Sequence, residues 1–220
     1  MKLSMRWVAI LLLGALLTAA APAAFPAPPK NRAAALDGLK SADTATRAEA
    51  VTWLANRGTM ADAPLLHERL RDESPFVRNF AESGLWLLWG RSGDARIDAR
   101  MARGVEQMQN GRYADAIEVF SSVIKEKPEF AEGWNRRATV LFLDGQMQRS
   151  IADCHEALRR NPGHFGALAG LGQIYLGLDD LEQSLAWFRK ALEVNPNMLG
   201  VEFSVRQLED ALKQKSRNTT

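Results

Sequence analysis

Three prolines divide the second half of this chain at equal intervals. Pro128, Pro162 and Pro196 stand 34 residues apart, and the residues between them recur in class at matching offsets. Aligned on these prolines, three units span residues 97–130, 131–164 and 165–198. A repeat of this length predicts stacked helical units, because one unit cannot bury its apolar face without a neighbour.

The columns inside each unit indicate two antiparallel helices. Apolar residues recur at spacings of three and four, and a turn signal separates the two segments of each unit. Small residues at facing positions let two helices approach closely, and each proline ends the second helix. The first small column is Gly104, Ala138 and Gly172, the second is Ala116, Ser150 and Ser184, the bulky column is Phe120, Cys154 and Phe188, and the turns are Asn110-Gly111, Asp144-Gly145 and Leu178-Asp179-Asp180.

The third unit reads Leu168-x2-Leu171-Gly172-x2-Tyr175, followed by a small residue, Phe188 and Pro196, and it resembles the tetratricopeptide repeat (TPR) family. The first unit departs from that motif in its front half, where Arg100, Arg103 and Gln107 replace apolar residues. The resemblance implies an all-α, right-handed superhelical solenoid of antiparallel helix pairs. We expect both flanks to cap the array, with a C-terminal capping helix over residues 199–214 and a disordered tail over 215–220.

The N-terminus has the layout of a secretory signal peptide over residues 1–23. Lys2 and Arg6 precede an apolar run from Trp7 to Leu17, and small residues end in Ala21-Pro22-Ala23. The alternative is an uncleaved N-terminal membrane anchor, although the run is shorter than the ~20 residues of a membrane span. We expect cleavage, export to the periplasm and no membrane span afterwards. A Pro-rich linker follows over residues 24–30.

A weaker repeat with an offset of 31 residues covers 31–92. Four pairs of residues match, and the second copy, Leu70-Arg-Asp-Glu-Ser-Pro-Phe-Val-Arg-Asn-Phe-Ala81, resembles a HEAT repeat. The alternative is two ordinary helical hairpins that cap the array. Either interpretation predicts an all-helical extension of the same solenoid. The matching pairs are Leu39 and Leu70, Arg47 and Arg78, Ala50 and Ala81, and Leu54 and Leu85.

Composition and spacing argue against several function classes. The chain without its leader has 26 basic and 26 acidic side chains and no basic run, so we expect no nucleic-acid partner. The single Cys154 occupies the bulky column and is expected in the core, and His67 and His164 lack the spacing of a metal site. Neither a phosphate-binding loop nor a nucleophile elbow occurs. We expect no cofactor, no metal, no small-molecule substrate and no enzymatic activity.

The apolar helix that carries Trp86 and Trp89 has two interpretations. The two rings could anchor a partner, or they could cover the junction between the two kinds of repeat. We favour the junction, because Leu85 and Leu88 make that helix apolar on all sides.

In the family that the chain resembles, ligands lie in a concave groove lined by the first helix of each unit. A column of apolar residues, Met108, Phe142 and Leu176, is then exposed in the groove or packed against the next helix. A subset of the family binds C-terminal carboxylates through Lys, Asn and Arg, and the matching positions here hold Met101, Val105, Arg136, Gly166 and Gly170. The groove candidates are Met101, Val105, Met108, Asn135, Arg136, Thr139, Phe142, Gln173 and Leu176, with Asp98, Glu132 and Ala169 beside them.

These observations predict a protein-interaction module or scaffold of the cell envelope that binds a peptide or helix of a partner protein. The missing carboxylate clamp argues against ligands held by a free C-terminus. Two alternatives stay open, a holdase-like assembly chaperone and a regulatory subunit of an envelope enzyme.

Overall fold

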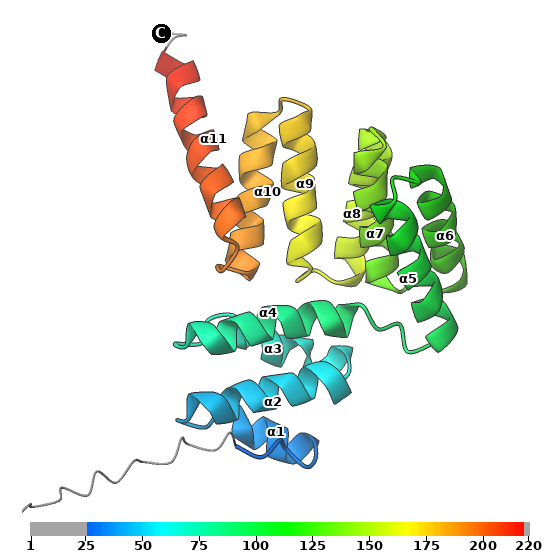
Figure 1. The fold of residues 1–220 in the computed structure, drawn as a ribbon. Coiled ribbons are helices and arrows are strands. Elements are labelled where there is room, and N and C mark those ends of the chain that lie inside the picture. The colour runs from blue at the N-terminus through cyan, green and yellow to red at the C-terminus, as the bar shows by residue number, and fades with distance from the viewer. Residues whose placement is uncertain (1–25, 218–220) are drawn as a thin grey trace, which may run out of the picture.

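The computed structural model describes residues 26–217, and every regular element in that range is helical (Figure 1). The predicted leader over residues 1–23 lies outside the described residues, as do 218–220. Residues 26–30 form neither helix nor strand, and the Asn31 side chain caps the first helix by accepting from the Ala34 N–H. The elements are α1 (Arg32–Gly38), α2 (Thr44–Arg57), the short 3-10 helix η1 (Met60–Asp62), α3 (Ala63–Arg69), α4 (Pro75–Trp89), α5 (Ala95–Gln109), α6 (Tyr113–Glu126), α7 (Ala131–Leu143), α8 (Met147–Arg160), α9 (Phe165–Gly177), α10 (Leu181–Val194) and α11 (Leu199–Arg217).

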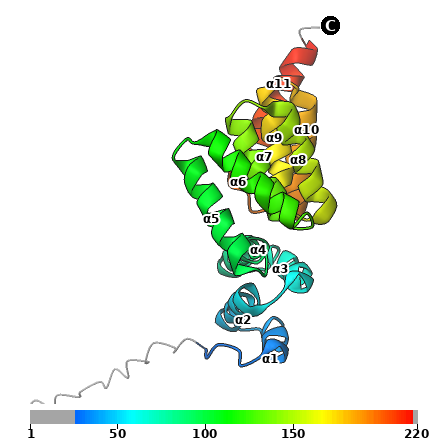
Figure 2. The ribbon, with the colours of Figure 1, turned by 90° about the vertical axis from the view of Figure 1, so that its right-hand side faces the viewer.

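Helices α5 to α10 form three antiparallel pairs, which we call the repeat array (Figures 1 and 2). Each pair corresponds to one 34-residue unit, and the all-α solenoid expected from the sequence is confirmed. The three turns inside the units share one backbone conformation. Gly111, Gly145 and Asp179, which occupy the same repeat position, have φ angles of 72°, 77° and 60°. Asp180 then caps α10 by accepting from the Gln183 N–H at 3.0 Å, as its position in the turn predicts.

The two small columns explain why the helices of a unit lie so close. A Cβ added at Gly104 would lie 2.6 Å from the Phe120 ring, and one added at Gly172 would lie 2.4 Å from the Phe188 ring. In the facing column the Ser184 hydroxyl donates to the Gly172 carbonyl at 2.8 Å. Ser150 donates to the Ala138 carbonyl at 2.7 Å in the same way. The small columns are therefore structural, as the sequence predicts.

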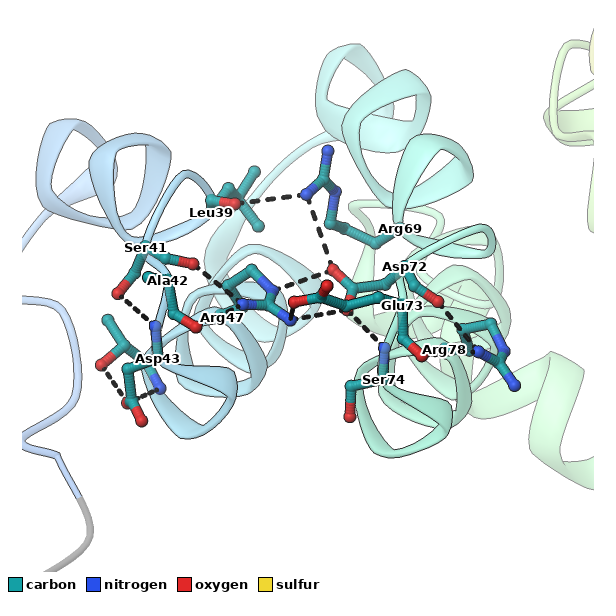
Figure 3. A network of polar contacts seen from close by, with 11 residues as sticks. Leu39, Ser41, Ala42, Asp43, Arg47, Arg69, Asp72, Glu73, Ser74 and Arg78 are labelled. Carbon is teal, nitrogen blue, oxygen red and sulfur yellow. Dashed lines mark hydrogen bonds and ion pairs between the residues drawn. The ribbon is translucent and has the colours of Figure 1, made fainter.

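The N-terminal helices form two pairs, α1 with α2 and α3 with α4, which we call the N-terminal pairs. Their 31-residue offset is visible in equivalent arginine contacts (Figure 3). Arg47 donates to the Ser41 and Ala42 carbonyls at 2.9 and 3.0 Å, and Arg78 donates to the carbonyls of residues 72 and 73 at 2.9 and 3.2 Å. The repeated contact fixes each turn against the following helix.

The next contact of each arginine differs between the two copies. Arg47 is 4% exposed, and its guanidinium donates two hydrogen bonds to the Asp72 carboxylate of the second pair, with N···O distances of 2.9 and 3.0 Å (Figure 3). Arg78 instead donates to the Asn197 side chain at 2.9 Å, and Asn197 donates to the Leu70 carbonyl at 2.8 Å. The turn after α10, which ends the third unit, thus stands where a further helical pair would continue the N-terminal pairs.

The N-terminal pairs do not extend the array from its first unit, which corrects the expectation of one continuous stack with a cap at each end. Helix α4 runs across the lower ends of α9 and α10 (Figure 1). The N-terminal pairs therefore do not stack on α5. On that helix Arg103 is exposed, Gln107 is half-buried, and Arg100 bonds to Glu126 of α6. The equivalent positions of the third unit hold Leu168, Leu171 and Tyr175, and the last two pack with Cys154 of α8. The first unit thus has polar residues where the third unit packs apolar ones on the preceding helix.

Aromatic rings fasten α4 to the third unit. Trp89 stacks on His164 with ring centroids 4.4 Å apart, and Trp86 meets Phe165 edge to face at 5.2 Å. Trp89 is 2% exposed and belongs to the same buried cluster as Phe165. The two tryptophans therefore cover the junction between the two repeat types, as expected, but against unit three.

Helix α11 packs on α10 and covers the far end of the array, as a capping helix should. Val205 and Leu208 are buried with Leu185 and Phe188 of α10. The helix continues to Arg217, so residues 215–217 are helical where the sequence suggested a tail. Among residues 26–217, none of the helices combines the length and hydropathy that crossing a membrane requires.

Candidate functional site

A hollow of about 180 Å³ lies between α7, α8 and α9, on the face lined by the first helices of the units. Four of the predicted groove residues, Asn135, Thr139, Phe142 and Gln173, line it together. Thr139 and Gln173 are exposed, whereas Phe142 is half-buried against Ala138, Cys154 and their neighbours. The structure thus brings residues of units two and three into one small site.

Two glycines of α9 border this hollow. Gly166 and Gly170 stand on α9, where the carboxylate-binding subset of the family has basic side chains. A Cβ at Gly170 would make ordinary contact with the Cys154 Sγ at 3.6 Å. A Cβ at Gly166 would lie 2.3 Å from Trp86, so the ring of the N-terminal pairs fills the space beside the helix. Gly166 is therefore required by the junction, while Gly170 borders empty volume.

Cys154 lies on the floor of the hollow and belongs to the core. It is 3% exposed and packs with Ala138, Leu171 and Ile174. Burial, and to a lesser extent the nearby charge of Asp153, raises the pKa of the Cys154 thiol to about 12. The thiol therefore behaves as a small apolar side chain, as its column in the repeat predicts.

A buried carboxylate organises the predicted groove residues of α7. Glu132 is 2% exposed, so it does not face the groove as expected. It accepts from Asn135 Nδ2 at 3.0 Å and from Arg136 Nε at 2.5 Å, and its Oε2 lies 2.9 Å from His164 Nε2. Burial alone would raise the pKa of Glu132, but its bonds with His164 and Arg136 lower it overall. Asn135 and Arg136 therefore have a structural role, since both side chains bond to the buried Glu132.

His164 completes this arrangement from the turn before α9. It is fully buried, and its Nδ1 accepts from the Ala167 N–H at 3.2 Å. A nitrogen that accepts carries no proton, so Nε2 donates to Glu132. The sequence placed Glu132 and His164 in different units and gave no signal that they pair.

The predicted groove residues of the first unit contribute less than expected. Met101 is 6% exposed and packs on Ile97 and Phe120, which removes it from the exposed groove. Val105 and Met108 are half-buried against the same cluster. Leu176 is half-buried against the cluster that joins α10 to α11. The apolar column of Met108, Phe142 and Leu176 is therefore packed on one side and accessible on the other.

A larger hollow of about 730 Å³ adjoins the first between α9 and α11. Gln173 and Gly170 border both hollows, and Glu82 of α4 reaches the edge of the larger one. Leu199, at the start of α11, lines it and is 75% exposed. Sequence reasoning missed the contributions of α4 and α11, because both depend on how the N-terminal pairs cross the array.

Among the described residues, no group of three or more His, Cys, Asp or Glu side chains is arranged to hold a metal ion. The site therefore offers apolar volume, exposed amide and hydroxyl groups, and buried structural charges. Such a surface suits recognition of a polypeptide segment.

Comparisons with known proteins agree with this description. Two family models described as tetratricopeptide repeat match residues 101–164 and 141–199. A TPR repeat-containing protein of Rhizobium etli is 28% identical over 148 residues, which cover 67% of this chain and 72% of the relative. Neither family model covers the N-terminal pairs, so their resemblance to HEAT repeats stays a prediction.

Two solved structures share the fold of the array. The first TPR of Spaghetti (RPAP3), bound to an HSP90 peptide, superposes with a TM-score of 0.52 at 21% identity, over 55% of this chain and 96% of that chain. The Sgt2 TPR domain from Aspergillus fumigatus gives 0.54 at 17% identity, over 58% of this chain and 85% of that chain.

Proposed function

Because residues 101–199 are tetratricopeptide repeats, we propose that the protein is a non-enzymatic interaction module. It holds a peptide or a helix of a partner protein in the concave groove formed by the first helices of the array. The groove is preformed by buried contacts on both sides, so binding orders the ligand more than the receptor. A structural relative supports this proposal, since the first TPR of Spaghetti (RPAP3) was solved with an HSP90 peptide.

The observation that carries the proposal is the 180 Å³ hollow beside Gly170. It is lined mainly by apolar atoms of Ala138, Phe142 and Ile174, and it has room for one apolar side chain of a ligand. The exposed Thr139 and Gln173 stand at its edge, where they can bond to the ligand backbone. The ligand is therefore a segment with one buried apolar anchor.

A free C-terminus is not what anchors the ligand. Gly166 and Gly170 supply no positive charge, and the guanidinium of Arg136 is engaged by Glu132 at 2.5 Å. Amidation of a ligand's C-terminus should therefore leave its affinity nearly unchanged.

Selection from a random peptide library tests the proposal. The wild type should enrich peptides that share one apolar residue, and Gly170→Leu should lose them because the new side chain fills the hollow. Ala114→Leu, which introduces the same side chain at an exposed position of α6, is the control and should select the same peptides. Enrichment that survives Gly170→Leu would place the ligand on another face.

The same selection separates the alternatives. Weak capture of many unrelated sequences would favour a holdase-like chaperone. A single stoichiometric partner from an envelope fraction, with activity that changes on binding, would favour a regulatory subunit.

Export to the periplasm is part of the proposal and rests on residues outside those described. Lys2, Arg6, the run from Trp7 to Leu17 and Ala21-Pro22-Ala23 support a cleaved leader. N-terminal sequencing of the protein from its native host should begin near Ala24. A chain that begins at Met1 in the membrane fraction would instead indicate an N-terminal anchor.

A further inference from the structure

The capping helix α11 keeps the register of the first helices of the array. Leu199 stands 34 residues after Phe165, and Phe203 stands 34 residues after Ala169, which lines the larger hollow. The first small column continues as Arg206, whose side chain leaves no room for a closely packed second helix. Helix α11 therefore acts as one more first helix, and it extends the concave groove beyond α9 (Figure 1).

Two large apolar side chains near the start of α11 are exposed. Leu199 is 75% exposed and Phe203 is 59% exposed, the highest fractions among the large apolar residues of 26–217. The two residues are one helical turn apart, so they lie on one face of the helix. Leu199 also lines the hollow of about 730 Å³, together with Met198 and Val201. Apolar side chains gathered beside a hollow are typical of a binding surface.

A single charged side chain borders the two hollows of the groove. Glu82 of α4 lines the larger hollow, and the other residues that line either hollow are uncharged at neutral pH. Glu82 is half-buried, and within residues 26–217 its carboxylate has neither an ion pair nor a hydrogen bond. Arg78, one turn away on α4, is bonded instead to Asn197 and to the carbonyls of residues 72 and 73. A ligand in the larger hollow therefore meets one unpaired negative charge.

We propose that the groove ligand is a basic, apolar segment of a partner protein. Its buried apolar anchor enters the hollow beside Gly170, and a second apolar side chain packs on Leu199 and Val201 in the larger hollow. A Lys or Arg close to this second residue pairs with Glu82, whereas an acidic segment is repelled. The inference rests on the proposed function and adds to it the charge of the ligand and its path from α9 to α11.

The position of Glu82 gives the N-terminal pairs a part in recognition. Glu82 belongs to α4, and it reaches the groove because α4 crosses the ends of α9 and α10 (Figure 1). The array alone supplies apolar and uncharged polar groups to the two hollows. The preference for a basic ligand therefore depends on the crossing of the two repeat regions.

Selection from a random peptide library tests the charge of the ligand. The wild type should enrich peptides with Lys or Arg near an apolar residue. Glu82→Lys should instead enrich Asp or Glu at that position. Glu118→Lys makes the same charge reversal at an exposed position of α6 and is the matched control, which should select the same peptides as the wild type.

A charge exchange between protein and peptide sharpens the result. Replacement of the basic residue of one enriched peptide by Glu should weaken its binding to the wild type about tenfold, measured by fluorescence anisotropy. The same acidic peptide should recover its affinity with Glu82→Lys. If Glu82→Lys does not fold, Glu82→Gln keeps the shape of the side chain and should bind the basic and acidic peptides equally.

The apolar contact on α11 has its own variant. Leu199→Asn should weaken the enriched peptide about five- to tenfold, because the ligand loses apolar contact area. Its melting temperature should stay near that of the wild type, since Leu199 is exposed. Leu87→Asn is the control at an exposed position of α4 that lines neither hollow, and it should bind as the wild type does.

The outcomes distinguish this inference from the function on which it rests. Peptides that are lost in Gly170→Leu but have no basic preference, or keep it in Glu82→Lys, would overturn the inference and leave the groove function in place. If no enriched peptide depends on Gly170, the proposed function fails, and the inference fails with it. A wild-type dimer that Leu199→Asn converts to a monomer in sedimentation experiments would mean that a second copy covers α11, which would also overturn the inference.

Discussion

The indole of Trp89 stacks on the imidazole of His164, with ring centroids 4.4 Å apart and planes inclined by 24°. Trp89 ends the last N-terminal helix, and His164 stands in the turn before the third unit of the array. Their contact therefore sets the angle at which the two regions cross. It also explains why the N-terminal pairs do not stack on the first unit, although α4 precedes that unit directly in the sequence.

Truncation of Trp89 should detach the N-terminal pairs from the array. We expect Trp89→Ala to lower the free energy of unfolding by about 3 to 5 kcal/mol, because a large buried ring leaves a cavity. Urea denaturation measures this loss. Trp187→Ala is the control, since Trp187 is only partly buried on α10 and its loss should cost less. Equal costs for the two variants would argue against a special role for the Trp89 contact.

The two glycines of α9 should respond oppositely to the same substitution. Gly170→Ala should stabilise the protein by about 0.5 to 1 kcal/mol, because alanine favours the helix and its Cβ meets only an ordinary contact. Gly166→Ala should destabilise by about 1 to 3 kcal/mol, since its Cβ would overlap the Trp86 ring. Urea unfolding of both variants under one condition checks the pair. Changes of equal sign would mean that Trp86 does not press on α9.

The turn of the third unit carries a residue in a conformation that favours glycine. Asp179 has a φ of 60°, where units one and two have Gly111 and Gly145. Asp179→Gly should therefore raise the free energy of unfolding by about 0.5 to 1 kcal/mol. Gly145→Asp is the reciprocal variant and should lower it by a similar amount. A stability loss in Asp179→Gly would show that the aspartate side chain contributes more than its backbone costs.

The parts of the fold that the sequence predicted correctly are those that recur at fixed spacing. Pro128, Pro162 and Pro196 mark the ends of second helices, and the small columns lie where helices touch the rings of Phe120 and Phe188. Each of these positions is constrained by its immediate neighbours in the unit. Local constraints of this kind leave a pattern that alignment of the units reveals.

The crossing of the two regions left no such pattern. Arg78 bonds to Asn197, and Glu132 lies against His164, in each case between residues far apart in the sequence. A single polar residue at the end of a helix gives the same sequence pattern whether its side chain is solvated or bonds to a residue far away in the sequence. For this reason the burial of Met101 and Glu132, and the site contributions of α4 and α11, could not be predicted.

The thiol of Cys154 should be inert in the folded protein. With 3% exposure and a pKa raised to about 12, almost none of it is ionised at pH 8. A colorimetric disulfide reagent should therefore react slowly under native conditions and rapidly in denaturant. Fast native reaction would show that the groove hollow opens to the core.

The buried pair of Arg47 and Asp72 should give the protein a measurable acid dependence. Burial raises the pKa of Asp72, but the fork from Arg47 and the bond from the Ser74 N–H together lower it below its ordinary value of 3.8. A carboxyl with a lowered pKa in the folded state stabilises that state above the unfolded pKa, and this stability is lost as pH falls through the folded pKa. At neutral pH, Asp72→Asn should cost about 3 to 5 kcal/mol, because Arg47 stays buried without its partner charge.

The difference in unfolding free energy between wild type and Asp72→Asn should be constant from pH 7 to about pH 5 and should shrink below about pH 4. Asparagine does not titrate, so the narrowing comes from the wild type as Asp72 takes up a proton and weakens its bond to Arg47. Asp37→Asn, at an exposed position of α1, should show no such difference at any pH. This difference in unfolding free energy could instead stay constant down to pH 3. Either Asp72 would then remain ionised throughout, or its protonation would not weaken the pair with Arg47. Measurement of the Asp72 carboxyl chemical shift by NMR over the same pH range separates these two results.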